Sequence, residues 1–138
     1  MSIQREWKFG THEARFEESD TLWVKIQGDT SLKDATALSE LYGEVGGQGP
    51  FYVVTDLREA TTVDAEAREH VSKNINPAWF LGSIYIGAGF IHRAVAKSLS
   101  LMHYLTGRLT FELHFVSTEE EARAVLERER NKRSAQVA

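Results

Sequence analysis

The hydrophobic pattern of this chain changes its period near Gly28, and this change limits the folds that the chain can adopt. Before Gly28, apolar and polar residues alternate one by one, as they do in a sheet with one face in water. Three segments show this alternation: residues 6–9, 13–17 and 22–27. The sequence therefore predicts a β-rich start, either a hairpin or a strand bent at Gly10-Thr11, and the pattern does not decide between these two.

After Gly28, helical spacing alternates with short apolar runs. Apolar residues recur every three or four positions in four segments, which begin near Ser31, Val63, Ile91 and Thr118. Both Ser31 and Thr118 are followed three residues later by an acidic residue, the pattern of a capped helix N-terminus. Between these helices lie three expected strands, at residues 51–55, 83–86 and 112–116. Such alternation indicates crossover connections and a largely parallel sheet.

The sequence thus predicts a single α/β domain over residues 1–130. Its mixed sheet would have about five strands, with four helices packed on it. A chain of 138 residues is long enough for one self-sufficient core. Residues 131–138 are polar apart from a few small side chains, and we expect them to form a flexible C-terminal tail.

Composition excludes several classes of function. The net charge of −4 argues against nucleic acid as a partner, because phosphate binding needs a basic surface. The chain has no cysteine and no apolar stretch long enough to span a membrane, so we expect a cytoplasmic protein. Its five histidines form no metal-ligand or nucleophile motif. We therefore predict no metal, no cofactor and no enzymatic activity.

Three segments carry a family resemblance. They are the strand Phe51–Leu57, the strand-to-turn unit Ile84–Phe90 and the acidic start of the last helix, Glu119–Leu126. In this order they resemble the STAS domains of sulfate transporters and anti-sigma-factor antagonists, and most closely a divergent bacterial branch grouped with CRAL-TRIO lipid-binding domains. The resemblance extends over nearly the whole chain and implies a STAS-like fold with a signalling role through protein–protein interaction.

The resemblance also implies a phosphoacceptor. In the anti-sigma-antagonist branch, a serine or threonine at the start of the helix after the central strand is phosphorylated, and this switches partner binding. Thr61 and Thr62 stand at the matching place in this sequence. The chain lacks the serines and the glycine that partner-switching members carry there. The alternative is that Thr61 or Thr62 only caps the helix.

An aromatic cluster gives a second candidate site. Trp79 and Phe80 lie in a loop-like stretch, and Phe90 and Met102 border or lie in the apolar helix that follows. These four residues could line a pocket for a small apolar, lipid-like ligand or form an interface. Ordinary core packing is the alternative.

Two readings of function follow from these sites. The first is a non-enzymatic STAS-like regulatory module that binds a protein partner and is switched by phosphorylation near the start of the second helix. The second is a carrier or sensor of a small apolar molecule. The open N-terminal strand could also pair with its counterpart in a second copy, which would give a homodimer.

Overall fold

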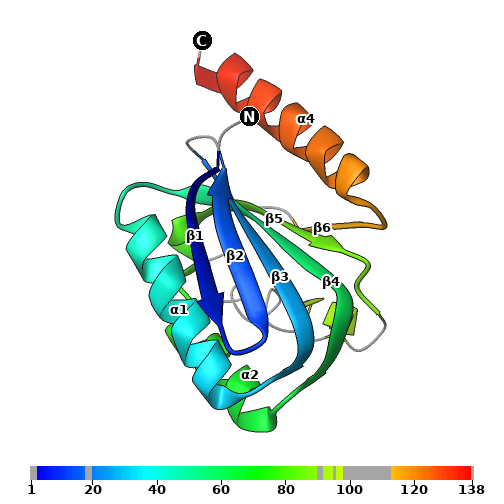
Figure 1. The fold of residues 1–138 in the computed structure, drawn as a ribbon. Helices are drawn as coiled ribbons and strands as arrows, with labels where there is room; N and C mark the ends of the chain where they lie inside the picture. The colour runs from blue at the N-terminus through cyan, green and yellow to red at the C-terminus, as the bar shows by residue number, and fades with distance from the viewer. Residues whose placement is uncertain (1–2, 18–19, 90–91, 95, 98–112, 138) are drawn as a thin grey trace.

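The computed structural model describes residues 3–17, 20–89, 92–94, 96–97 and 113–137 (Figure 1). Its strands form one sheet in which the spatial order equals the chain order. The first three strands pair antiparallel, and the third to sixth pair parallel. The strands are β1 (Ile3–Phe9), β2 (His12–Glu17), β3 (Thr21–Thr30), β4 (Phe51–Val63), β5 (Phe80–Ile86) and β6 (Leu113–Val116).

Helices cover the two faces of the sheet unequally. One face carries α1 (Leu32–Gly46) and α2 (Ala65–Asn74), and the other carries α4 (Glu119–Val137) (Figure 1). A short 3₁₀ helix, η1 (Pro77–Trp79), leads into β5. Because each parallel crossover moves one strand along the sheet in the same direction, its right-handed path leaves the connecting helix on the same face every time. This explains why α1 and α2 share a face.

Each face has its own apolar core. On the α1 side, aromatic rings of α1, β4 and β5 meet: Tyr42 and Phe80 lie edge to face with centroids 5.2 Å apart, and Phe51 is 5.3 Å from Phe80. On the α4 side, the buried residues are fewer and lie under one helix. These α4-side residues are Trp23, Tyr52, Val54, Ile84, Ile86, Ala122, Val125 and Leu126.

The predicted helix caps are confirmed. The Ser31 hydroxyl accepts the Asp34 N–H at 3.2 Å, and the Asp34 carboxylate accepts the Ser31 N–H in return, a complete capping box for α1. The Thr118 hydroxyl accepts the Glu121 N–H at 3.1 Å and so caps α4. Both caps place acidic side chains in the first helical turn, where the helix dipole favours them.

The predicted α/β class with a mixed sheet is confirmed, and the N-terminal question is answered. Residues 3–17 form two strands rather than one bent strand, and the turn between them contains Gly10 with a φ of 60°. The left-handed region is accessible to glycine at little cost, which is why the chain can reverse there. The sheet has six strands among the described residues, against about five predicted.

Two boundaries differ from the prediction. The predicted strand covers residues 51–55, but β4 continues to Val63, because its polar second half still pairs with β3 through Gln27–Glu59 and Thr30–Val63. Residues 131–137, predicted as a flexible tail, continue α4 to Val137. The third predicted helix falls mostly outside the described residues, although 92–94 and 96–97 are helical.

The first strand lies at one edge of the sheet (Figure 1). Its side chains contact α1 through an ion pair between Arg5 and Glu44, 2.8 Å between Nη1 and Oε1. A homodimer formed through this edge stays a prediction. No described helix combines the length and the apolar character that crossing a bilayer requires.

Candidate functional site

The carboxyl ends of β3 and β4 bring Asp29 and two threonines together at the end of the molecule where α2 begins. The Thr61 hydroxyl donates to Asp29 Oδ1 at 2.5 Å, and the Thr62 hydroxyl donates to the same oxygen at 2.7 Å. The Thr62 backbone N–H also points to it, at 3.2 Å. All three residues are exposed. We call this group the Asp29–threonine cluster.

Three donors on one carboxylate oxygen stabilise its charged form. Hydrogen bonds from Thr61 and then Thr62 lower the pKa of Asp29 to about 2. The carboxylate is therefore ionised at neutral pH. A phosphate group on either threonine would bring about two further negative charges against Asp29. Modification would consequently break the cluster and change the shape and charge of the surface around it.

The backbone of Asp29 is held in place from the N-terminal hairpin. The buried His12 ring accepts the Gln27 N–H at Nδ1, 2.9 Å away, so its proton is on Nε2. Nε2 lies 3.1 Å from the Asp29 carbonyl oxygen, to which it donates, and 3.3 Å from an Asp34 carboxylate oxygen. His12 thus ties the hairpin, the end of β3 and the start of α1 together beneath the cluster.

The structure corrects one of the two predictions for Thr61 and Thr62. Neither residue caps α2: both lie in β4, and the N-cap residue is Asp64, whose side chain makes no capping hydrogen bond. The phosphoacceptor role stays a prediction. Sequence reasoning missed Asp29, because nothing in the local pattern near Gly28 links it to residues more than thirty positions away.

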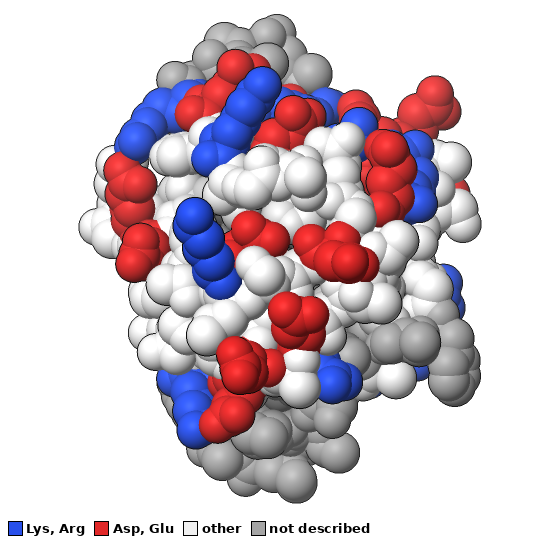
Figure 2. All heavy atoms as spheres, turned by 60° about the horizontal axis from the view of Figure 1, so that its bottom comes forward, with Lys and Arg blue, Asp and Glu red and all other residues white. Residues whose placement is uncertain are grey.

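The surface at this end of the molecule carries charges of both signs. Figure 2, which turns the bottom of Figure 1 toward the viewer, shows acidic and basic side chains interspersed, with several acidic ones close together. Among the charges near the cluster, Lys25 pairs with Glu59 at 3.2 Å. A molecule that binds this surface would therefore have to match the pattern of positive and negative charges, because neither sign of charge predominates.

The second candidate site is a cavity of about 210 Å³ between the sheet and the layer formed by α1 and α2. We call it the apolar pocket. Aliphatic and aromatic side chains make most of its wall, and a few hydroxyl groups interrupt them. Its lining residues are Ile26, Thr30, Leu38, Tyr42, Val53, Thr55, Leu57, Val63, Val71, Ile75, Pro77, Phe80, Ser83, Tyr85, His92, Ala96 and Leu113.

The aromatic cluster predicted from the sequence is divided by the structure. Phe80 is buried and lines the apolar pocket. Trp79 does not line it and packs on α1 instead, so closely that a Cβ at Gly46 would lie 2.7 Å from the indole ring. Trp79 is therefore not part of the pocket wall, and a role at an interface stays a prediction. Phe90 and Met102 lie outside the described residues.

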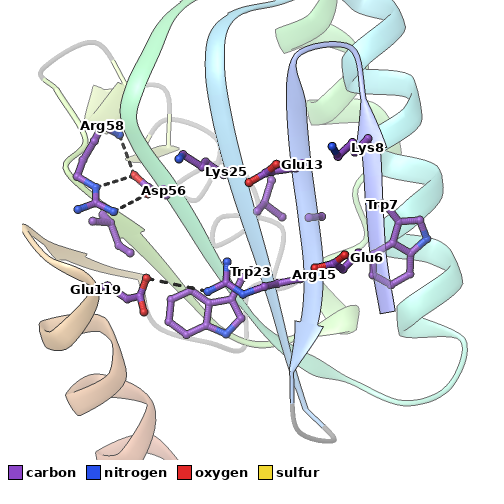
Figure 3. Close-up of a pocket in the computed structure, with 13 residues that line it drawn as sticks. Glu6, Trp7, Lys8, Glu13, Arg15, Trp23, Lys25, Asp56, Arg58 and Glu119 are labelled. Atoms are coloured by element: carbon purple, nitrogen blue, oxygen red, sulfur yellow. Dashed lines mark hydrogen bonds and ion pairs between the residues drawn. The ribbon is translucent and has the colours of Figure 1, made fainter. Parts of the chain in front are cut away.

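A third hollow lies on the opposite face of the sheet, beside α4. It measures about 370 Å³, and Figure 3 shows charged side chains from β1, β2, β3 and β4 around it. Opposite charges face each other across neighbouring strands, as in the row Lys8, Glu13, Lys25 and Asp56. Such cross-strand pairs stabilise a sheet surface that lies in water. This charged groove is therefore accounted for without a ligand.

Next to the groove, Trp23 and Glu17 connect the sheet to α4. The Arg15 and Arg123 guanidinium groups lie 5.0 Å and 4.4 Å from the Trp23 ring (Figure 3 shows Arg15 beside it). Both arginines also bond Glu17, at 2.6 Å and 3.3 Å. Burial would raise the pKa of Glu17, but hydrogen bonds from Arg15 and Arg123 outweigh it and lower that pKa.

One serine–histidine pair needs a chemical explanation. Ser39 Oγ lies 2.9 Å from His70 Nε2, and Asn74 Nδ2 lies 3.3 Å from His70 Nδ1. The same amide nitrogen donates to the His70 carbonyl oxygen at 2.9 Å, so it is a donor, and Nδ1 accepts from it. The proton is then on Nε2 and points at Ser39, whose own hydroxyl donates to the Thr36 carbonyl at 3.0 Å. In this tautomer the histidine cannot act as a base for Ser39.

Among the residues that the structure describes, no three histidine, aspartate or glutamate side chains gather as a metal site would require. Of the five histidines, His12 and His70 have the structural contacts given above, and His114 pairs with Glu129 at 3.0 Å. His92 borders the apolar pocket, and His103 lies outside the described residues.

Comparison with known proteins identifies the fold. No family model matches the chain, and no curated protein matches it in sequence. Among solved structures, the anti-sigma factor antagonist SpoIIAA in its unphosphorylated form aligns with a TM-score of 0.63 at 12% identity, covering 85% of this chain and 98% of SpoIIAA. The phosphorylated form of SpoIIAA, a Bacillus cell fate determinant, gives 0.59 at 12% identity, covering 84% and 99%.

A third structure extends the likeness. An uncharacterized DUF3478-family protein from Shewanella loihica, described as having a SpoIIAA-like fold, aligns with a TM-score of 0.58 at 15% identity, covering 87% of this chain and 98% of that one. The chain therefore has the SpoIIAA-like fold, and the resemblance to STAS domains is confirmed at the level of the fold.

Proposed function

We propose that this protein is a non-enzymatic STAS-like module that binds a protein partner through the surface at the end of β4 and the start of α2. The observation that carries the proposal is the Asp29–threonine cluster, in which two exposed hydroxyls converge on one ionised carboxylate. The SpoIIAA-like fold supports it, since the neighbours of known role are anti-sigma factor antagonists.

Phosphorylation of Thr61 or Thr62 would act as the switch. The unmodified cluster is compact, because Asp29 accepts both hydroxyl protons. A phosphate in place of one proton removes that hydrogen bond and adds a repulsive charge beside the carboxylate. The end of β4 and the first turn of α2 would then present a different surface, and partner affinity would change.

The test uses charge-mimicking variants and a matched control. Thr61→Glu and Thr62→Glu each add a carboxylate at the cluster, and Thr118→Asp adds one at α4 while keeping a residue type that caps helices. Each tagged protein captures partners from a lysate of its own host, and quantitative mass spectrometry measures what remains bound. We expect both glutamate variants to lower capture of the main partner by about tenfold or more, because like charges placed at an interface are costly.

Two results would contradict the proposal. One is equal capture by the wild type and both glutamate variants. The other is an equal loss with Thr118→Asp, which would mean that any added charge on the domain weakens binding. Circular dichroism on all four proteins checks that each remains folded.

We propose a second function, as a carrier or sensor of a small apolar molecule, because a specific observation favours it. Among the residues that the structure describes, seventeen line the apolar pocket, Phe80 included, and none of these seventeen is Asp, Glu, Lys or Arg. Native mass spectrometry of protein purified from its host tests this function: a co-purifying small molecule is the expected result, and a pocket that stays empty in repeated preparations would count against it.

A further inference from the structure

Hydroxyl groups supply the polar part of the apolar pocket. Among the lining residues that the structure describes, Tyr42 and Thr55 contribute hydroxyls from α1 and β4, and Ser83 and Tyr85 contribute them from β5. Thr55 and Ser83 are almost fully buried, so their hydroxyls have little access to water. Each hydroxyl carries one proton and can donate it to a molecule in the pocket.

The lining residues that the structure describes carry no charge to match a charged ligand. None of them is an acidic residue, a lysine or an arginine. His92 is the basic side chain among these residues, and burial lowers its pKa, which favours the neutral form. Burial likewise raises the pKa of Tyr42 and Tyr85, so both phenols keep their protons. A carboxylate or ammonium group brought into this wall would lose its hydration and gain no counter-ion.

We infer that the apolar pocket binds an uncharged molecule of about ten non-hydrogen atoms, with a ring or short-chain body and one oxygen that accepts a hydrogen bond. The inference rests on the second proposed function and names its ligand class. The size follows from volume, since an apolar cavity of about 150 Å³ holds a benzene molecule and this pocket is larger, at about 210 Å³. Long-chain fatty acids do not fit this description, because they are too large for the pocket and carry a charged carboxylate.

Three probes of nearly equal shape separate these properties. They are 4-methylacetophenone (neutral, with an acceptor oxygen), 4-ethyltoluene (neutral, without one) and 4-methylbenzoate (charged). Binding to the full chain at pH 7.5 is measured by NMR titration of the Val53 and Ser83 amides. We expect the ketone to bind at least about tenfold more tightly than the benzoate, with the hydrocarbon in between.

Variants assign the binding to the pocket. Tyr85→Phe removes one hydroxyl without changing the ring, and it should lower ketone affinity about two- to tenfold while leaving hydrocarbon affinity unchanged. Val71→Phe places a ring at the pocket wall and should weaken all neutral probes. Arg68→Phe, at an exposed position of the same helix, is the control and should bind like the wild type.

The outcomes test the inferred ligand class separately from the proposed ligand-binding function. Benzoate binding as tight as ketone binding, or a Tyr85→Phe effect equal on ketone and hydrocarbon, would overturn the inferred class and leave a ligand-binding pocket in place. No binding by any probe to the folded wild type would overturn both. Binding that Val71→Phe leaves unchanged would place the molecule elsewhere and also overturn the inference.

Discussion

The two faces of the sheet are built from the same strands but differ in what covers them. On the α1 side, α1 and α2 form a layer over β3, β4 and β5 and leave the apolar pocket beneath it. On the α4 side of the part of the chain that the structure describes, α4 covers a small core, and a charged groove with paired charges lies beside it. The strand order causes this difference, because successive crossovers in one direction place their helices on one face.

The difference teaches where binding sites can arise in such a fold. On the α4 side, the charged side chains of the groove already pair with one another, so few of them are available to bind a ligand. The covered face has a cavity and hydroxyl donors, and the edge where its strands end carries the Asp29–threonine cluster. The α4 side would then serve stability, and the α1 side with its strand ends would serve binding. The following predictions test that division, from the largest expected effect to the smallest.

Removing a leucine side chain from the α4 core should have the largest effect. Leu126 is 2% exposed, and Leu126→Ala should lower the free energy of unfolding by about 2–5 kcal/mol. Leu32→Ala, at a leucine that is 40% exposed, is the matched control and should change it by less than about 0.5 kcal/mol. Urea denaturation measures both. Similar small effects for the two would show that α4 contributes little to stability.

Two neighbouring valines of β4 point to opposite faces of the sheet, so their substitution compares the stability that each face contributes. Val54 is 0% exposed and packs under α4, whereas Val53 is 3% exposed and borders the apolar pocket. Val54→Ala should cost about 2–3 kcal/mol and Val53→Ala about 1–2 kcal/mol, because a side chain beside a cavity has fewer contacts to lose. Thermal and urea unfolding measure the difference. A larger cost for Val53→Ala would mean that the pocket is filled in solution.

The Glu17 network should contribute less, and its contribution should depend on pH. Glu17→Gln removes the charge that Arg15 and Arg123 bond, at an expected cost of about 1–2 kcal/mol near pH 7, since both arginines are partly exposed. Because the pKa of Glu17 is lowered on folding, this stabilisation is complete above its usual value of 4.5 and is lost as pH falls through the folded pKa.

Unfolding of the wild type and Glu17→Gln across acidic pH checks this prediction. The gap between the two proteins should shrink as the pH decreases. A gap that stays constant, or one that widens toward acid, would show that the Glu17 charge does not stabilise the contact between the sheet and α4.

The smallest effect is a titration at the exposed Asp29–threonine cluster. The Asp29 carboxyl should titrate in NMR with a pKa of about 2, against a usual value near 3.8. Any stabilisation from this shift is present above the usual pKa and is lost as pH falls toward the folded one. In a Thr61→Val, Thr62→Val double variant, the midpoint should return toward 3.8. A wild-type midpoint near 3.8 would mean that the threonines do not bond Asp29 in solution.

Local patterns were sufficient to predict most of the fold. The alternation in β2 and β3, the Ser31 and Thr118 caps and the glycine-rich end of α1 each depend on residues a few positions apart. Their structural effect is therefore visible in the sequence. The second half of β4 could not be predicted from the sequence, because Arg58 and Glu59 are exposed and polar, as turn residues usually are. Its pairing with β3 decides its conformation, and that pairing is a long-range contact.

The candidate sites were predictable only in part, for the same reason. The sequence names Thr61, Thr62 and Phe80 as candidates, which the structure places in the Asp29–threonine cluster and in the pocket wall, but it gives no sign of Asp29. Trp79, also a candidate, packs on α1 and does not line the pocket. The hydroxyls that line the apolar pocket come from α1, β4 and β5, and only the fold brings these elements together. Tertiary contacts of this kind leave no local signal.

The most direct test of the central claim is peptide mass spectrometry of the intact protein purified from its host, with and without its bound partner. The account predicts phosphate on Thr61 or Thr62 in the free fraction and unmodified threonines in the partner-bound fraction. Phosphate at neither residue in both fractions, or equal phosphorylation of the two fractions, would contradict it.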